Sequence, residues 1–260
     1  MKYILILSVL LAGCLSNKIE FNSHGTYQIA AICKDGIVIG TDTRTAITNK
    51  NLEIMAFYDT VQKIYPFEDY SISSSGNFLI QGKYLPFYYK EYRDSFPIMN
   101  ELKYNMLNFF TFLYYKYPLV YKEAFNNKMI FAGYENNKPS ICFTRYGRYD
   151  CVRDSGYVAE DTLSEFKYYT NLTCEEAAKK IDTAICRYVS KYKKEREIGT
   201  YVSVLKIKKD NTSEWLLHPP NLELRTFKDF INAYKANRIK ISFTSEQNRR
   251  MILNEIAKYQ

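Results

Sequence analysis

The sequence has 260 residues, a mass of 30.6 kDa and a formal net charge of +8, with 47% hydrophobic and 25% charged residues. This composition is typical of a globular protein with room for one large or two small domains, and it excludes collagen-like, low-complexity and wholly disordered chains. The excess of Lys and Arg is spread along the chain in runs typical of solvated surfaces, so we expect no nucleic-acid partner.

The first 14 residues have the layout of a secretory signal. A single lysine precedes an apolar run at residues 4–11, which is too short to span a bilayer. Residues 11–14 (LAGC) resemble the lipobox of bacterial lipoproteins, in which Cys14 carries the lipid and becomes the mature N-terminus. We therefore expect an exported protein, periplasmic or on the surface, that is anchored at the cell envelope through a lipid on Cys14. An ordinary cleaved signal that ends near a cysteine is the alternative.

Two hairpins are predicted after a short leader at residues 15–25. Residues 28–33 and 37–41 are apolar on successive positions, and Lys34-Asp35-Gly36 between them contains the Asp-Gly turn signal. Strands with this pattern are covered on both faces of their sheet. The second predicted pair covers residues 61–65 and 70–74 and leads to Gly76.

The middle of the chain is rich in aromatic residues. Pro86 and Pro97 divide it, with Pro86 expected to interrupt the first long helix, and residues 98–115 have the spacing of a buried helix. Strands are predicted at residues 128–134, 140–144 and 149–152. Cys142 and Cys151 flank Tyr146-Gly147: a two-residue turn would place the cysteines opposite each other and allow a disulfide, whereas a longer loop would separate them.

The last third of the chain alternates helices and strands. A helical pair is predicted after residues 154–156, and its second member starts with a capping box at Thr173 to Glu176. Strands at 199–207 and 214–218 precede two amphipathic helices, one after Thr226 and one after Ser245. This order suggests two sheets between two helical layers in one domain. The predicted units are a signal peptide (1–14), a leader or linker (15–25), one domain (26–220) and a helical extension (221–260).

The first predicted hairpin carries a resemblance to a known family. It is preceded by Gly25-Thr26 and ends in Asp42-Thr43-Arg44. This succession resembles the opening of proteasome beta subunits, which are N-terminal nucleophile (Ntn) hydrolases. Residues 61–64 (VQKI), 75–77 (SGN) and 154–156 (DSG) resemble, in order, the family's lysine segment, its oxyanion loop and the Gly-Ser-Gly before its third helix. The resemblance covers roughly residues 24–218 and implies an α+β fold, a four-layer αββα sandwich of two antiparallel sheets between helical layers.

The resemblance also assigns chemical roles. Thr26 is the nucleophile, set free when the chain cuts its own Gly25–Thr26 bond. The liberated α-amine then serves as the base, and because such an amine has a pKa of about 7.7–8.0, no histidine is required. This matters because the chain has only His24 and His218, too few for most imidazole chemistry.

The remaining assignments complete the expected site. Lys63 favours the neutral amine by charge repulsion, and Asp42 holds Lys63 in place. Backbone N–H groups at Gly76 stabilise the oxyanion, Ser155 supports the amine, and Glu195 replaces the family's Asp. Each residue taken singly also has a structural interpretation, as a strand start, an ion pair or a turn. No metal or cofactor is expected, since the cysteines form no CxxC pair.

Three departures from the family bear on activity. Ile198 stands where active members carry a serine, Tyr27 is bulkier than the usual second residue, and Pro86 falls in the first long helix. The resemblance therefore implies a self-processing threonine hydrolase acting on peptide or other amide bonds, or an amidase with a small substrate. The alternative is a catalytically silent, proteasome-like lipoprotein that serves as a scaffold or binding protein. The family assembles into rings, so a homo-oligomer is a further expectation.

Overall fold

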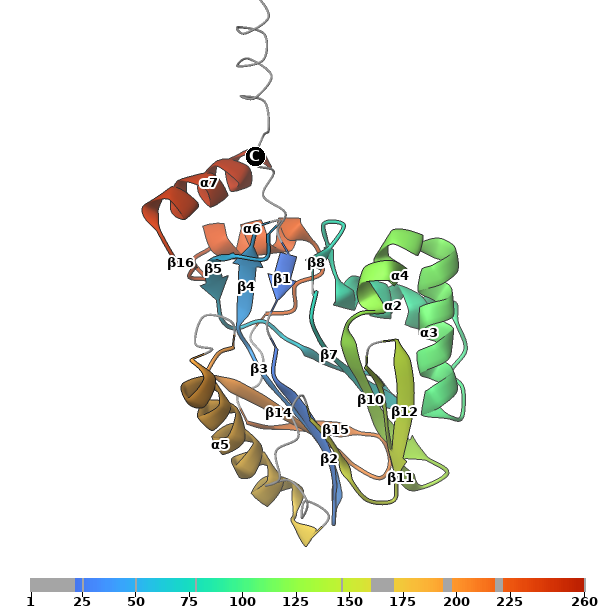
Figure 1. The fold of residues 1–260 in the computed structure, drawn as a ribbon. Coiled ribbons are helices and arrows are strands. Elements are labelled where there is room, and N and C mark those ends of the chain that lie inside the picture. The colour runs from blue at the N-terminus through green and yellow to red at the C-terminus, as the bar shows by residue number, and fades with distance from the viewer. Residues whose placement is uncertain are drawn as a thin grey trace, which may run out of the picture.

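The computed structural model describes residues 22–24, 26–49, 51–77, 79–145, 147–159, 171–193, 198–217 and 222–259. The predicted signal peptide and the lipidation site at Cys14 lie outside these residues. No helix within the described ranges is long and apolar enough to cross a membrane. Figure 1 shows strands in the middle of the molecule, with α5 on one outer side and α2, α3 and α4 on the other.

The first sheet is antiparallel and has the strand order β13-β2-β3-β14-β15. Its strands are β2 (Gln28–Cys33), β3 (Gly36–Asp42), β13 (Tyr157–Ala159), β14 (Val202–Ile207) and β15 (Ser213–Leu217). Along β2, Ile29 and Ala31 pack against α5 (Cys174–Tyr192), while Ala30 and Ile32 face the second sheet. Since successive residues point to opposite faces of a strand, the continuous apolar run is buried on both sides, and this prediction is confirmed.

The second sheet is also antiparallel and has the order β12-β11-β10-β7-β6. It consists of β6 (Ile64–Pro66), β7 (Tyr70–Ser75), β10 (Lys128–Glu135), β11 (Lys138–Arg145) and β12 (Arg148–Arg153). Ile130 and Ile141 pack on Ile37 and Ile39 of the first sheet in one buried cluster. The opposite face, which includes Phe131, lies under helices. All five strands are near their predicted positions.

The helical layer over the second sheet is built from aromatic rings. It contains α2 (Leu85–Ser95), α3 (Leu102–Lys116) and α4 (Pro118–Ala124). Phe109 of α3 lies 5.2 Å from Tyr89 and 6.4 Å from Phe131, measured between ring centroids. The expectation that Pro86 interrupts a helix is wrong: Pro86 lies in the first turn of α2, where a missing N–H costs no helical hydrogen bond.

A third antiparallel sheet joins segments from both ends of the chain. Its order is β1-β4-β5-β16, with β1 (Asn22–His24), β4 (Thr45–Thr48), β5 (Ile54–Tyr58) and β16 (Ser242–Phe243). The part of the predicted leader at residues 22–24 is therefore a strand paired with β4. A further pair, β8 (Leu79–Ile80) with β9 (Lys83–Tyr84), precedes α2. No sequence signal predicted the third sheet.

The two C-terminal helices begin where the sequence predicts. Thr226 caps α6 (Phe227–Lys235) in a full capping box, and Ser245 caps α7 (Glu246–Ala257). Both helices bury apolar residues, among them Phe230 and Ile252, in the same cluster that contains the buried face of α2.

The segment after Gly156 differs from the prediction. Instead of starting a helix, residues 157–159 form β13, which pairs with β2 so that Val158 lies opposite Ala30. This pairing covers the edge of β2 that β3 leaves open. The rest of the first predicted helix, residues 160–170, lies outside the described residues. The second predicted helix is confirmed as α5, with the capping box of Thr173 and Glu176.

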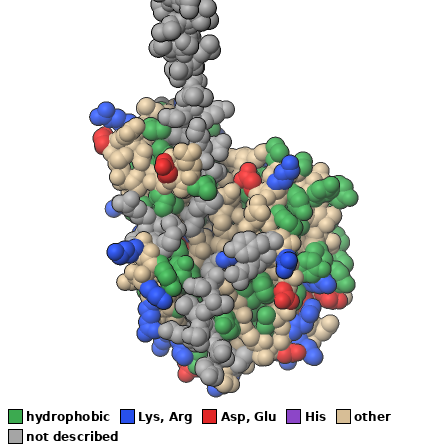
Figure 2. Space-filling view, viewed as in Figure 1, with side chains coloured by type: hydrophobic (Ala, Val, Ile, Leu, Met, Phe, Trp, Pro, Cys, Tyr) green, Lys and Arg blue, Asp and Glu red, His purple; other side chains and the backbone are tan. Residues whose placement is uncertain are grey.

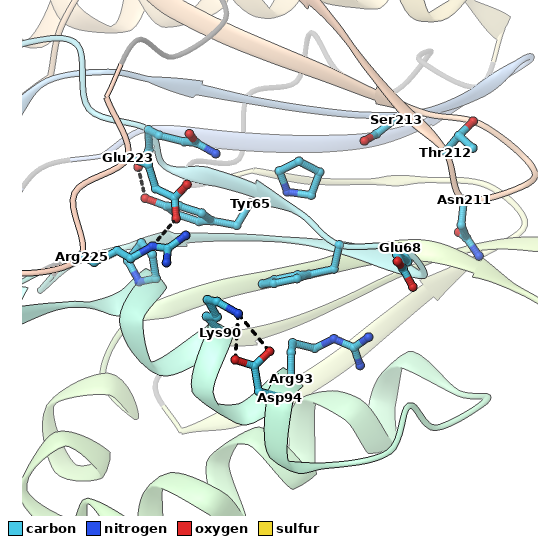
Figure 3. Close-up of a pocket in the computed structure, with 14 residues that line it drawn as sticks. Tyr65, Glu68, Lys90, Arg93, Asp94, Asn211, Thr212, Ser213, Glu223 and Arg225 are labelled. Carbon is cyan, nitrogen blue, oxygen red and sulfur yellow. Dashed lines mark hydrogen bonds and ion pairs between the residues drawn. The ribbon is translucent and has the colours of Figure 1, made fainter.

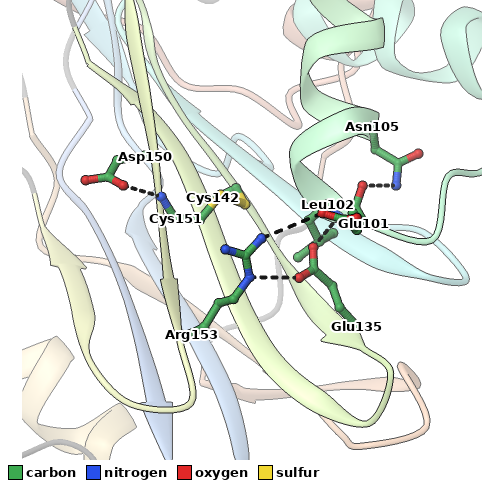
Figure 4. The surroundings of a disulfide bond; sticks show 8 residues. All are labelled: Glu101, Leu102, Asn105, Glu135, Cys142, Asp150, Cys151 and Arg153. Atoms are coloured by element: carbon green, nitrogen blue, oxygen red, sulfur yellow. Dashed lines mark hydrogen bonds and ion pairs between the residues drawn. A yellow bond between two sulfur atoms is a disulfide. The ribbon is translucent and has the colours of Figure 1, made fainter.

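The β11–β12 hairpin has the two-residue turn that would align its cysteines. Cys142 lies opposite Cys151, the two Cα atoms are 4.1 Å apart, and the sulfurs are bonded. Gly147 supplies the positive φ (+72°) that such a turn requires. Figure 4 shows Arg153 beside this disulfide, 3.3 Å from the carboxylate of Glu135, which also accepts the N–H of Leu102 at the start of α3.

Figure 2 shows where side chains of different kinds gather on one face of the molecule. Lys and Arg side chains gather over α5, while hydrophobic side chains gather over α3 and α4. Tyr114 and Tyr115 of α3 are exposed and line a groove of about 410 Å³, and Leu119 of α4 is also exposed.

A charged cluster fixes the start of α5 on the first sheet. Lys206 Nζ of β14 lies 2.6 Å from Asp35 and 3.0 Å from Glu175, and Asp35 also accepts the N–H of Cys174 at 2.8 Å. Burial acts to raise the pKa of Asp35, but the bonds to Lys206 and Cys174 outweigh it and lower the pKa below 3.8. The bond to Lys206 likewise lowers the pKa of Glu175.

We expect Asp35→Asn to reduce the free energy of unfolding at pH 7 by about 1 kcal/mol or less, because the pair is partly solvated. Because the pKa of Asp35 is lower in the folded than in the unfolded protein, its carboxylate stabilises the fold at pH values above the unfolded pKa of 3.8. This contribution is lost as the pH falls through the pKa of the folded state. Urea unfolding of the wild type should therefore lose more stability below pH 4 than the variant does. Asp94→Asn, in the exposed pair with Lys90, is the control. Equal acid sensitivity of wild type and Asp35→Asn would contradict this assignment.

Candidate active site

A buried carboxylate, Asp42, organises one end of the first sheet. It is the last residue of β3, and its side chain is fully buried. One oxygen accepts the N–H of Tyr27 at 2.9 Å, and the other accepts the N–H groups of Arg44 at 2.9 Å and Gly199 at 3.1 Å. Three backbone donors from separate segments therefore meet on one side chain, as a buried charge requires.

Lys63 supplies the countercharge. Its ammonium nitrogen lies 3.3 and 3.2 Å from the two oxygens of Asp42 and also donates to the carbonyl oxygen of Arg44. The side chain is 1% exposed. Burial lowers the pKa of Lys63, and the Asp42 carboxylate opposes this shift. Burial likewise raises the pKa of Asp42, against the effect of Lys63 and the three backbone donors. Asp42 and Lys63 thus form a desolvated ion pair. Burial makes the Lys63 ammonium release a proton, and the Asp42 carboxylate accept one, more readily than in water.

Thr26 lies directly beside this pair. It precedes β2 and is half-buried, and the nitrogen of the next residue, Tyr27, is the one that Asp42 holds. In return, the N–H of Asp42 donates to the carbonyl of Tyr27 at 3.3 Å. The structure therefore brings Thr26, Asp42 and Lys63 together at the same end of the sheet. Gly25, the other half of the predicted cleavage site, lies outside the described residues.

The Gly76 loop is linked to the same end of β2. Gln28 Nε2 lies 3.4 Å from Ser75 Oγ, and Gln28 Oε1 accepts from Ser73 at 2.9 Å. Gly76 follows with φ of +106°, and a Cβ at this position would lie 2.3 Å from Asn127 Oδ1. Only glycine is compatible with that backbone. No role was predicted for Gln28 from the sequence. A polar residue at the start of an otherwise apolar strand is the signal that could have indicated one.

One of the other predicted residues, Ser155, is not brought to this end. Ser155 is exposed and lies beyond Tyr157, which pairs with Ala31, so the antiparallel register places Ser155 near the β2–β3 turn. At about 3.3 Å per residue, this is roughly 20 Å along β2 from Thr26. Glu195 lies outside the described residues. Ile198 packs in the apolar cluster under α5, which accounts for its hydrophobic side chain.

A second ion pair supports the backbone on which Lys63 depends. Arg44 binds both oxygens of Asp59 at 2.8 Å and stacks over Phe57, with its guanidinium carbon 4.5 Å from the ring centre. A Cβ at Gly199 would lie 2.9 Å from both Arg44 and Asp59. The carbonyl of Arg44 that accepts from Lys63 is therefore held by a fork-like ion pair and by close packing.

We expect Asp59→Ala to lower the free energy of unfolding by about 1–2 kcal/mol, because it removes a bidentate, partly buried pair. Asp94→Ala is the matched control, since the same substitution removes a pair in which both side chains are more than half exposed and should cost no more than about 0.5 kcal/mol. Urea unfolding measures both values. Equal costs for the two variants would show that the Arg44–Asp59 pair adds nothing beyond a surface pair.

A cavity of about 810 Å³ opens next to β6, an edge strand of the second sheet. Figure 3 shows Tyr65 on one side of it and Lys90, Arg93 and Asp94 of α2 on another, with ion pairs between Lys90 and Asp94 and between Arg225 and Glu223. Gln62, the neighbour of Lys63 in the chain, also lines it, but Thr26 and Asp42 do not. Among the described residues, no group of three or more His, Cys, Asp or Glu could hold a metal ion.

Comparison with known proteins shows the fold. No protein-family model matches the sequence, and no curated protein matches it. Among solved structures, the chain is similar to a Gly-1 mutant of Anbu from Hyphomicrobium sp. strain MC1, with a TM-score of 0.54 and 13% identity over 82% of this chain and 94% of that one. Anbu is a proteasome-like Ntn-type protein, so this chain has a proteasome-like fold of mixed α/β type with antiparallel sheets.

Proposed function

We propose that this protein is a self-processing threonine hydrolase that cuts peptide or other amide bonds, and that its layers form the four-layer αββα sandwich of Ntn hydrolases. The observation that carries the proposal is the buried Asp42 carboxylate, which binds the amide next to Thr26 and the ammonium of Lys63 together. An ion pair with only a structural role needs no threonine beside it. A threonine nucleophile, in contrast, needs its hydroxyl and its α-amine close to groups that control the charge of the amine.

The proposed chemistry begins with cleavage of the bond before Thr26. The freed α-amine takes the proton of the Thr26 hydroxyl, and the oxygen attacks the substrate carbonyl. The amide C–N bond of the substrate then breaks, the departing amine takes that proton, and an acyl-enzyme remains. Lys63 keeps the nearby amine neutral by charge repulsion, and Asp42 holds Lys63 in position. Backbone N–H groups around Gly76 stabilise the tetrahedral oxyanion, and water then releases the acyl group.

A silent, lipid-anchored scaffold remains the competing function, and two observations favour it. Residues 22–24 are paired with β4 rather than free, which suits a leader that is kept. Ile198 contributes to the apolar core rather than a hydroxyl to the site. In this reading Cys14 holds the uncut chain at the cell envelope, and the amide nitrogen of Thr26 stays acylated and is no base.

The state of the N-terminus tests the two functions against each other. The full chain is expressed, purified and analysed by intact-mass spectrometry and N-terminal sequencing. The hydrolase proposal requires a mature chain that starts at Thr26. A chain that stably keeps residues 22–24 after prolonged incubation at pH 7–8, and that hydrolyses none of a panel of fluorogenic peptides, would overturn it and support the scaffold.

A further inference from the structure

Two cysteines with no role in the proposed hydrolysis meet at the opposite end of β2 from Thr26. Cys33 is the last residue of β2 and pairs with Gly36 across the β2–β3 turn. Cys174 is the first residue of α5. Both are buried, at 8% and 0% exposure, and both are free thiols in the structure.

The glycine of the turn allows the two sulfurs to approach. A Cβ on Gly36 would lie 2.9 Å from Cys174 Sγ, so this sulfur lies directly on the turn. The Cα atoms of paired residues such as Cys33 and Gly36 are only about 4.5–5.5 Å apart, and the side chains of Cys33 and Cys174 belong to the same buried cluster. Asp35, within the turn, accepts the N–H of Cys174 at 2.8 Å, which fixes the start of the helix on the hairpin.

The surroundings make this pair a poor reactive site in the folded protein. The hydrogen bond to Cys33 raises the pKa of Cys174, and burial and the Asp35 carboxylate act in the same direction. A thiol that is buried and not ionised is a weak nucleophile and a weak metal ligand. The feature that remains is the proximity of two thiols, in a chain whose Cys142 and Cys151 are already joined.

We propose that Cys33 and Cys174 form a second, buried disulfide that joins the β2–β3 turn to the start of α5. Both S–H bonds break and one S–S bond forms, while the disulfide of an external oxidant, a small-molecule or protein disulfide, is cleaved to two thiols that receive the hydrogens. Thiol–disulfide exchange supplies this chemistry. It takes place during folding, before α5 covers the pair. The bond closes a loop of about 140 residues, and in the chain-entropy model long loops constrain the unfolded state most.

Mapping of the disulfides tests this proposal directly. The full chain is unfolded and reduced, refolded during incubation with oxidised and reduced glutathione, and then denatured, alkylated with iodoacetamide and digested. Mass spectrometry should find a peptide pair linked through Cys33 and Cys174, with Cys186 alkylated. The proposal is wrong if Cys33 and Cys174 are both alkylated after incubation with glutathione, or if either is linked to a different cysteine.

Thermal unfolding provides a second measurement that does not depend on proteolysis. Cys33→Ala and Cys174→Ala should lower the melting temperature by similar amounts, about 5 °C or more, and Cys186→Ala, the control, should leave it nearly unchanged. Reductant should reduce the difference in melting temperature between the wild type and Cys33→Ala, because only the wild type has the Cys33–Cys174 disulfide to lose. A difference that is the same with and without reductant would assign the loss to packing and would contradict the proposal.

Discussion

Thr26→Ala should leave the chain uncut at Gly25–Thr26 and abolish hydrolysis of amide substrates. The variant removes the hydroxyl that attacks both the chain's own peptide bond and the substrate carbonyl, so we expect activity to fall by at least about 10³-fold. Intact mass reports the cut, and release of a fluorophore from peptide substrates reports turnover. Because Thr26 is half-buried at a strand start, the substitution should change stability by less than about 1 kcal/mol.

Two further variants separate loss of chemistry from loss of fold. Thr26→Ser keeps a hydroxyl and should retain both processing and measurable turnover. Thr212→Ala removes an exposed threonine in the turn before β15 and should behave as the wild type does. If Thr26→Ala is processed normally, or hydrolyses substrate as fast as the Thr212→Ala control, Thr26 is not the nucleophile.

Lys63→Met should cost about 3–5 kcal/mol of unfolding free energy, because it leaves the Asp42 carboxylate buried without its countercharge. Lys206→Met is the matched control: the Lys206 side chain is largely buried, but the two carboxylates that it binds are partly exposed and keep contact with water. We therefore expect a loss of about 1 kcal/mol. Urea denaturation of both variants gives the comparison. Similar losses would mean that Asp42 is neutral in the folded protein or is reached by water.

The double variant Asp42→Asn, Lys63→Met distinguishes structure from catalysis. A neutral amide at position 42 keeps an acceptor for the backbone donors and removes the uncompensated charge, so part of the lost stability should return. Turnover of amide substrates should not return, since no ammonium remains beside the amine that processing sets free. Recovery of both would show that the ion pair has only a structural role.

Much of the fold could be predicted because local signals and the tertiary structure agree. The Asp-Gly turn and the continuous apolar runs around it gave β2 and β3, and Thr173, Thr226 and Ser245 marked the starts of α5, α6 and α7. A two-residue turn was enough to align Cys142 with Cys151. Each of these features depends on residues that lie within a few positions of one another.

The features that sequence reasoning missed depend on contacts between distant segments. β13 is a strand because β2 offers it an open edge, and the third sheet exists because residues 22–24 and 242–243 meet β4 and β5. Ser155 could be matched to a motif by its spacing, but only the register of β13 shows that it lies at the wrong end of β2. Asp59 and Gly199 likewise carry no signal until Arg44 is placed between them.

The hydrogen bond from the Tyr27 amide to Asp42 has a consequence for maturation. Ordering a backbone residue costs about 1–2 kcal/mol, and here that cost is met when the sheet forms. Cleavage of the Gly25–Thr26 bond would therefore create an N-terminus at Thr26 that is already ordered. No slow rearrangement would then be needed between the cut and the first turnover.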